Sequence, residues 1–195
     1  MSRTITRLYD SYADAKATLR ALEAAGVPRA DISLVANNAI EAHGADTHNE
    51  SGLGAEVGAG VGAVAGSGAG LLAGLGMLAI PGLGPVVAAG WLAALAIGAA
   101  GGATAGGLLG ALVGAGIEND NAEVYTEGVR RGGTLISVRV PEDRASEIAA
   151  IMDTYRAVDV AGRRIAYAEA GWTGYDPAAR AYSPEEIERE RATYR

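Results

Sequence analysis

The sequence contains no cysteine and no phenylalanine, and it has only two histidines. Without cysteine there is no disulfide framework and no thiol chemistry, which fits a reducing compartment without proving one. Two histidines leave little material for nucleophilic or metal-assisted catalysis. We therefore expect a protein that is not an enzyme, with no catalytic residue, no cofactor and no metal.

Charge is absent from a long central stretch. The 16 basic and 23 acidic residues all lie outside residues 57–117, and the net charge is −7. This acidic balance argues against nonspecific nucleic-acid binding, which needs a concentrated Lys/Arg surface. The pairs Arg130-Arg131 and Arg163-Arg164 are too small for such a surface, and we interpret them as solvated. The N-terminus lacks the apolar core of a secretory signal, so export by the usual route is not expected.

Apolar periodicity outside the uncharged stretch predicts two strand–helix–strand units. In the first, a strand over 4–9 precedes a helix that Ser11 begins and Gly26 ends, and a second strand follows at 32–36. The second unit has a strand over 136–140, then a helix that Pro141 opens. Two further elements are expected: a last strand marked by Ile165 and Tyr167, and a short helix from Asp120 to Gly132-Gly133 before the second unit.

Two such units in series give the βαββαβ order of a ferredoxin-like α+β sandwich. We assign residues 1–40 and 118–170 to this sandwich, with an insert at 52–117 between its second and third strands. A C-terminal tail at 171–195 includes a short helix that begins at Ser183-Pro184. Three aromatic residues are expected to hold the tail against the domain: Trp172, Tyr175 and Tyr182.

The insert repeats glycine every fourth residue in two ladders. A four-residue step rises ~6 Å along a helix and stays near one face, so two such helices could touch backbone to backbone. Paired antiparallel about Gly84, the ladders register, with Ala94 replacing one glycine. Pro81-Gly-Leu-Gly-Pro is a turn signal between arms at about 57–80 and 86–116. We predict an antiparallel glycine-zipper helical hairpin that packs through Gly54, Gly58, Gly62, Gly66, Gly70, Gly74, Gly90, Gly98, Gly102, Gly106, Gly110 and Gly114.

Each arm would be long enough to span a bilayer if it were helical. Three features count against insertion: the arms are mostly Gly and Ala, the strongly apolar residues gather near the turn, and the flanks are acidic with no basic residue from the hairpin to Arg130. The alternative is a soluble homo-oligomer in which hairpins from several subunits bury one another. The sequence leaves open whether the medium around the glycines is lipid or protein.

Two other kinds of site have weaker support. A polar loop before the insert could bind a divalent cation, but its spacing matches no metal signature, and we assign no metal site to Glu41, His43, Asp46, His48 and Glu50. The glycine-rich insert contains neither a dinucleotide fingerprint after a strand nor a Gly-Lys-Ser/Thr motif. A ligand-sensing regulatory module is a further possibility that rests on fold analogy alone.

Several segments resemble the bacterial general stress protein (YflT-like) domain. They are Thr4-Ile-Thr-Arg-Leu-Tyr-Asp-Ser-Tyr-Ala, the centre from Leu78 to Pro85, Tyr125-Thr-Glu-Gly-Val-Arg-Arg-Gly-Gly, and Gly171-Trp-Thr-Gly-Tyr-Asp-Pro. The resemblance covers nearly the whole chain and offers no catalytic residue. It implies a bacterial stress-response protein that is cytoplasmic or associated with the inner membrane, its head in the cytoplasm. We expect self-association through the hairpin, either in or on that membrane or in a soluble homo-oligomer.

Overall fold

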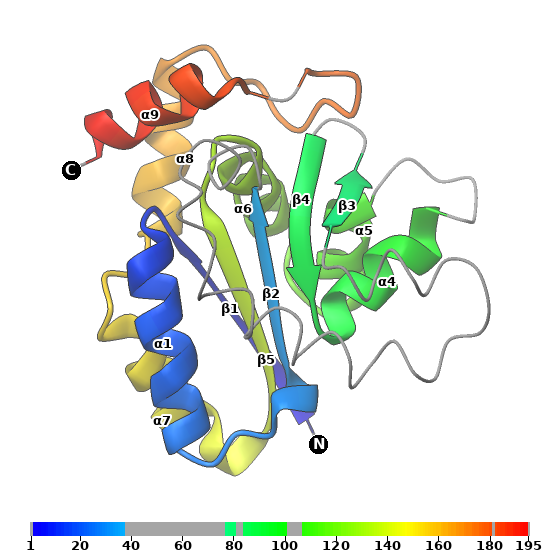
Figure 1. The fold of residues 1–195 in the computed structure, drawn as a ribbon, viewed down its shortest axis with the longest axis vertical. Helices are drawn as coiled ribbons and strands as arrows, with labels where there is room; N and C mark the ends of the chain where they lie inside the picture. Colours follow the sequence, from blue (N-terminus) through cyan, green and yellow to red (C-terminus); the bar gives the residue numbers. More distant parts are fainter. Residues whose placement is uncertain (1, 38–76, 81–83, 101–106, 181, 195) are drawn as a thin grey trace, which may run out of the picture.

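The computed structural model describes residues 2–37, 77–80, 84–100, 107–180 and 182–194. Its centre is a five-stranded antiparallel sheet in the order β1–β5–β2–β4–β3 (Figure 1). The strands are β1 (Ser2–Tyr9), β2 (Ile32–Asn37), β3 (Met77–Ile80), β4 (Gly84–Ala89) and β5 (Thr134–Pro141).

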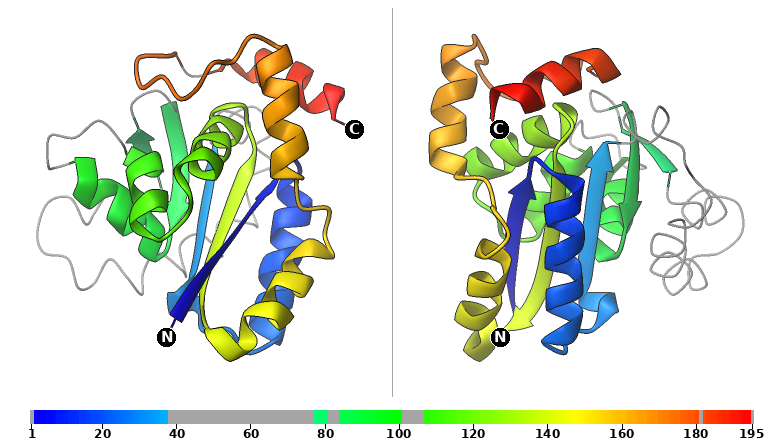
Figure 2. Two further views of the ribbon diagram at one scale, coloured as in Figure 1. Left: turned by 180° about the vertical axis from the view of Figure 1, so that it is seen from behind. Right: turned by 60° about the vertical axis from the view of Figure 1, so that its left-hand side comes forward.

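Helices cover both faces of this sheet (Figure 2). One face carries α1 (Tyr12–Ala24) and α7 (Ala145–Asp153), and the other carries α4 (Trp91–Ala100), α5 (Gly107–Gly114) and α6 (Asn119–Arg130). Two further helices, α8 (Val160–Glu169) and α9 (Pro184–Thr193), lie at one end of the sheet. Short 3₁₀ turns at Arg29–Asp31 and Glu142–Arg144 precede β2 and α7. We call residues 2–37 and 118–170 the head.

Several helix ends lie where the sequence signals place them. The Ser11 hydroxyl accepts a hydrogen bond from the Asp14 N–H at 3.4 Å at the start of α1, and Gly26 beyond its end has a φ of +77°. A capping box of Ser183 and Glu186 begins α9. The predictions of α1, α7, α9 and the strands over 4–9, 32–36 and 136–140 are confirmed. The helix expected from Asp120 is α6, which begins one residue earlier, at Asn119.

The prediction of a last strand at Ile165 and Tyr167 is wrong, because both residues lie on α8. Asp159 caps this helix: its carboxylate accepts hydrogen bonds from the N–H groups of Ala161 at 3.1 Å and Gly162 at 3.2 Å. Residues two apart share a face on a strand but not on a helix. Accordingly, Ile165 is 61% exposed and Tyr167 is 1% exposed.

The complete ferredoxin-like arrangement is not confirmed. The order β1–β5–β2 is that of the first, third and second strands of such a sheet, but β4 and β3 extend it beyond β2. On the outer edge of β1, the Val158 N–H donates to the Leu8 carbonyl at 2.8 Å and the Tyr125 hydroxyl to the Thr6 carbonyl at 3.0 Å. These groups occupy carbonyls that a fourth strand would need. The chain is therefore a mixed α/β protein built on an antiparallel sheet.

The prediction of two helical arms is wrong next to the turn, where Met77–Ile80 and Gly84–Ala89 are strands. Ile80 lies opposite Gly84, and β4 pairs with β2. A short apolar run without a clear period cannot be assigned to helix or strand from sequence alone, and here β2 supplies a partner. In the described part of the rest of the second arm, α4 and α5 are separate helices that pack against each other. The first arm up to residue 76 lies outside the described residues.

Candidate functional site: the outer face of α4 and α5 and a buried arginine cluster

Helix α4 is positioned by the two residues at its start, Gly90 and Trp91. Gly90 has a φ of +94°, and a Cβ there would overlap the Ile32 carbonyl oxygen and lie 2.7 Å from the Ser33 Cα. Only glycine lets the chain pass this close to β2. The Trp91 indole N–H donates to the Asp31 carbonyl at 3.1 Å, and the Ser33 hydroxyl donates to the Ala89 carbonyl at 2.8 Å. These contacts hold the start of α4 against β2.

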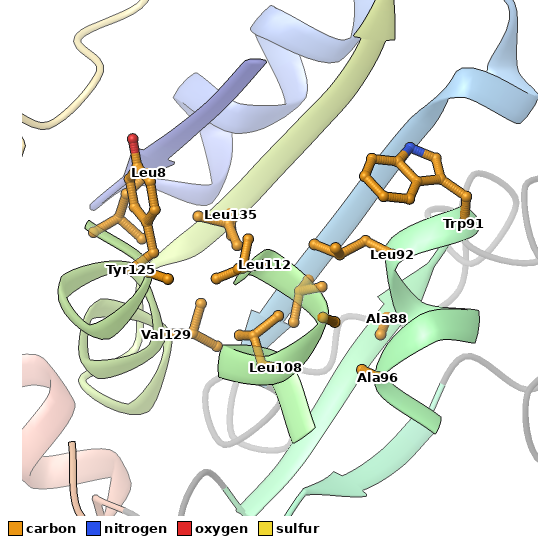
Figure 3. Close-up of a cluster of buried hydrophobic side chains, with 13 residues drawn as sticks. Leu8, Ala88, Trp91, Leu92, Ala96, Leu108, Leu112, Tyr125, Val129 and Leu135 are labelled. Carbon is orange, nitrogen blue, oxygen red and sulfur yellow. The ribbon is translucent and has the colours of Figure 1, made fainter. Parts of the chain in front are cut away.

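The inner faces of α4 and α5 belong to the folded core (Figure 3). Leu92, Leu108 and Leu112 are at most 1% exposed, and they pack in one cluster with Val129 of α6 and Leu135 of β5. Full burial of one such leucine contributes roughly 1.5–3 kcal/mol. The two helices are therefore integral to the second core of the sheet and are not an appendage to the head.

The outer faces of the same helices are uncharged and exposed. Leu95 is 47% exposed and Val113 is 43% exposed. Gly110 and Gly114 are exposed as well, and no described atom lies within 4 Å of a Cβ built at either. We call Ala94, Leu95, Gly110, Val113 and Gly114 the uncharged face. An exposed apolar surface of this kind marks an interaction site more often than a scattered surface leucine does.

Four of the twelve glycines predicted to pack in the hairpin lie in the described residues. Gly90 is a turn residue, Gly98 lies on α4, and Gly110 and Gly114 lie on α5. The predicted partners of Gly98, Gly110 and Gly114 are outside the described residues, so the mirrored pairing stays a prediction. The glycines outside the described residues are Gly54, Gly58, Gly62, Gly66, Gly70, Gly74, Gly102 and Gly106.

The interpretation of the arginine pairs as solvated is wrong for one member of each pair, because Arg131 and Arg163 are both 8% exposed. Arg131 Nε donates to Glu127 Oε1 at 2.6 Å, and Glu127 is itself 1% exposed. The Arg163 guanidinium donates to both carboxylate oxygens of Asp10, at 2.9 and 2.6 Å. Arg130 also bonds to Glu127, with Nε 2.7 Å from Oε2. Two guanidinium groups therefore share one buried carboxylate.

Burial and hydrogen bonding act in opposite directions on these arginines. Burial lowers the pKa of Arg131, but hydrogen bonds to Glu190 and Glu127 outweigh it and the pKa is raised. Beneath Arg131, the Tyr167 ring lies 4.0 Å from the guanidinium carbon, and burial raises the pKa of its hydroxyl. A helical signal was available: Glu127 precedes Arg130 and Arg131 by three and four residues, and Arg163 precedes Tyr167 by four.

The described residues contain neither a metal-binding cluster nor a membrane-spanning helix. Within the ranges described, no cluster of three or more His, Cys, Asp or Glu side chains could hold a metal ion. Among the same residues, no helix has the length and apolar character needed to cross a membrane. The loop with His43 and His48 lies outside these ranges.

Comparison with known proteins finds no match: no family model, no curated protein and no solved structure is similar to the chain. The resemblance to the YflT-like domain therefore stays a prediction. The function has to be argued from the uncharged face and the arginine cluster.

Proposed function

We propose that this protein is a non-enzymatic bacterial stress-response protein that self-associates through its glycine-rich, uncharged insert, with a second copy as its partner. The observation that carries the proposal is the difference between the two faces of α4 and α5. Their inner faces are buried in the core, while their outer faces expose Leu95 and Val113 and no charge.

The physical reason is that exposing such an apolar surface to water is unfavourable. Burying apolar area between copies is favourable in proportion to the area removed from water. Gly110 and Gly114 add no side chain, so the backbone of a neighbouring helix could approach α5 closely. The stress-response assignment rests on the resemblance of the sequence segments and not on the fold.

A second candidate is that the insert lies in or on the inner membrane, with the head in the cytoplasm. The feature that favours it is the absence of charge throughout residues 57–117, since charged side chains are costly in the hydrocarbon core. Both candidates use the same insert. They differ in whether the uncharged face meets protein or lipid.

Sedimentation velocity of the full chain tests self-association. We expect a defined oligomer for the native protein, and dissociation in Leu95→Glu and Val113→Glu, because each change would bury a charge at the interface. Ile165→Glu is the matched control: Ile165 is a more exposed apolar residue, at 61%, but it lies on α8. It should leave the oligomer intact.

A native protein that is monomeric at every concentration would contradict self-association. An oligomer that is unchanged in both Leu95→Glu and Val113→Glu would show that the uncharged face does not hold the copies together. Flotation of the same proteins with phospholipid vesicles separates the candidates. The membrane candidate is favoured if the native chain sediments as a monomer without vesicles, binds to vesicles, and loses that binding in Val113→Glu.

A further inference from the structure

Helix α9 crosses the end of the sheet beside α8 and is joined to it by a segment with no helix or strand in its described residues (Figure 1). Ile187 is the only fully buried residue of the helix. The remaining residues of α9 are half-buried or exposed. Such an element has few apolar contacts and belongs to the less stable end of a fold.

The contacts of α9 with the head come from one face. Ile187, Glu190 and Tyr194 are spaced by three and four residues, so they project from the same side of the helix. The Ile187 side chain fills the space that a Cβ at Gly132 would occupy. Arg131 Nη1 donates to Glu190 Oε1 at 2.7 Å. This pattern of anchors is typical of a helix that binds in a groove.

The surface under α9 is held in place by the head itself. Arg131 keeps its hydrogen bond to Glu127 on α6, and Arg163 keeps Asp10 at the end of β1, whether or not α9 is present. The Arg163 guanidinium carbon lies 3.6 Å from the Tyr194 ring centroid. If α9 leaves, neither buried guanidinium loses its carboxylate in the head. Release is therefore not opposed by an unpaired buried charge.

A cavity lies at the end of α9, and a buried hydrogen-bond donor lies in the segment that leads to this helix. A cavity of about 750 Å³ separates its end from the start of α1; Tyr194 lines it on one side and Asp10 and Ser11 on the other. In the connecting segment, the Trp172 indole N–H is buried and has no hydrogen-bond partner in the described residues. An unpaired buried donor lowers the stability of the docked arrangement.

We propose that α9 is a detachable strap: it leaves as a unit while the head stays folded, and it uncovers a receptor for one short helix. Arg131, the Gly132 notch and Arg163 form this receptor. Its ligand is a helix with the spacing of isoleucine, glutamate and an aromatic residue seen at 187, 190 and 194. In the structure α9 occupies the receptor in cis. This inference does not depend on the uncharged face, which lies on other helices.

Hydrogen exchange of the full chain, followed by mass spectrometry, tests the strap. We expect the amides of α9 to exchange at least about tenfold faster than those of α6 and β5, through local opening. Ile187→Ala and Glu190→Gln should each speed exchange in α9 by about a further tenfold and leave α6 unchanged. Glu188→Gln is the matched control, because Glu188 lies on the exposed face of the same helix. It should change the rate less than about twofold.

If α9 exchanges only together with α6 and β5, even in Ile187→Ala, it is not a separate unit and the strap is refuted. A second measurement tests the receptor. The peptide of residues 183–195 is added to isotope-labelled full chain carrying Ile187→Glu. In this variant the strap lacks the isoleucine that packs against Gly132. We expect NMR shifts at the amides of Arg131 and Gly132, and none from a peptide that carries Ile187→Glu itself. Equal responses to the two peptides, or no response to either, would overturn the receptor.

Discussion

Helices α5 and α6 follow each other in the sequence and pack side by side on the same face of the sheet, yet their glycines have opposite surroundings. A Cβ at Gly128 of α6 would overlap the buried Leu8 side chain. A Cβ at Gly110 of α5 would meet no described atom within 4 Å. The glycine of α6 is required by the fold of one chain. Gly110 of α5 is not required by any contact within the described residues.

The charges follow the same division. Around α6, carboxylates and guanidinium groups pair in buried and half-buried positions, from Glu127 with Arg131 to Asp10 with Arg163. Neither α4 nor α5 contains a titratable group. Contacts within the chain therefore hold the head together. The uncharged face has no such polar contacts within the described residues and is available to a partner. Four predictions test how sharp this division is.

The largest effect is expected from Glu127→Ala. The change leaves the buried Arg131 and the half-buried Arg130 without their shared carboxylate, which should lower the free energy of unfolding by about 3–5 kcal/mol. Asp120→Ala on the same helix is the control, because the Arg164–Asp120 pair is exposed, and it should cost less than about 1 kcal/mol. Urea unfolding measures both. Equal losses would show that the buried ion pairs of Glu127 stabilise the fold no more than the exposed pair of Asp120.

Gly90→Ala should be next, at roughly 3 kcal/mol. It combines the strain of a positive φ with overlap against the backbone of β2. Gly116→Ala separates the two causes, because Gly116 has a φ of +88° but no described atom lies within 4 Å of a Cβ built there. It should lose only about 1 kcal/mol. If thermal unfolding shows the two variants to be alike, α4 is not held against β2 as tightly as the structure indicates.

Alkaline pH should destabilise the fold through titratable groups of the head. Burial raises the pKa of Tyr9 from 10.0 to about 12, and its hydroxyl donates to the Met152 carbonyl at 2.9 Å. The folded state therefore favours the protonated tyrosine. This contribution is complete below pH 10.0 and is lost as the pH rises toward about 12. It amounts to roughly 3 kcal/mol.

Between these pH values the free energy of unfolding should fall less steeply in Tyr9→Phe than in the native chain. Other buried tyrosines, such as Tyr125, act in the same direction, so the difference between the two proteins is the quantity that matters. Parallel curves would mean that Tyr9 does not contribute to the alkaline loss.

The smallest effect is expected from Gly110→Ala, and it has the opposite sign. With open space on the outer face of α5, the helix should gain about 1 kcal/mol from the better helix former. Gly128→Ala should destabilise, because its Cβ meets Leu8. Thermal unfolding at concentrations below any association gives both values. Destabilisation by Gly110→Ala would mean that α5 packs closely within its own chain.

Much of the head could be predicted because its signals are local. Ser11 and Ser183 cap helices through their own side chains, and the strand over 32–36 is a short, mostly apolar run, although the structure buries both of its faces. The strand expected at Ile165 and Tyr167 was wrong because two residues cannot distinguish alternation from the spacing of a helix, and the cap at Asp159 outweighed them.

The rest depends on contacts that no local pattern contains. Leu78 and Val87 lie in strands because β2 offers β4 an edge, whereas glycine spacing alone favoured helices. Arg131 is buried because Glu190, from α9, meets it across the fold. The sequence predicts close approach at Gly110 and Gly114, and no described atom lies near either glycine, so that prediction stays open. It could not indicate whether their neighbour is the same chain, another copy or lipid.

The central claim is that the uncharged face holds copies of the protein together. Sedimentation velocity of the native chain and of Gly110→Leu, at one concentration, tests it most directly, because the added side chain meets open space within the described part of the chain. The account predicts an oligomer for the native chain and a monomer for the variant, with an undiminished free energy of unfolding. A native monomer, or a variant oligomer of unchanged size, would contradict it.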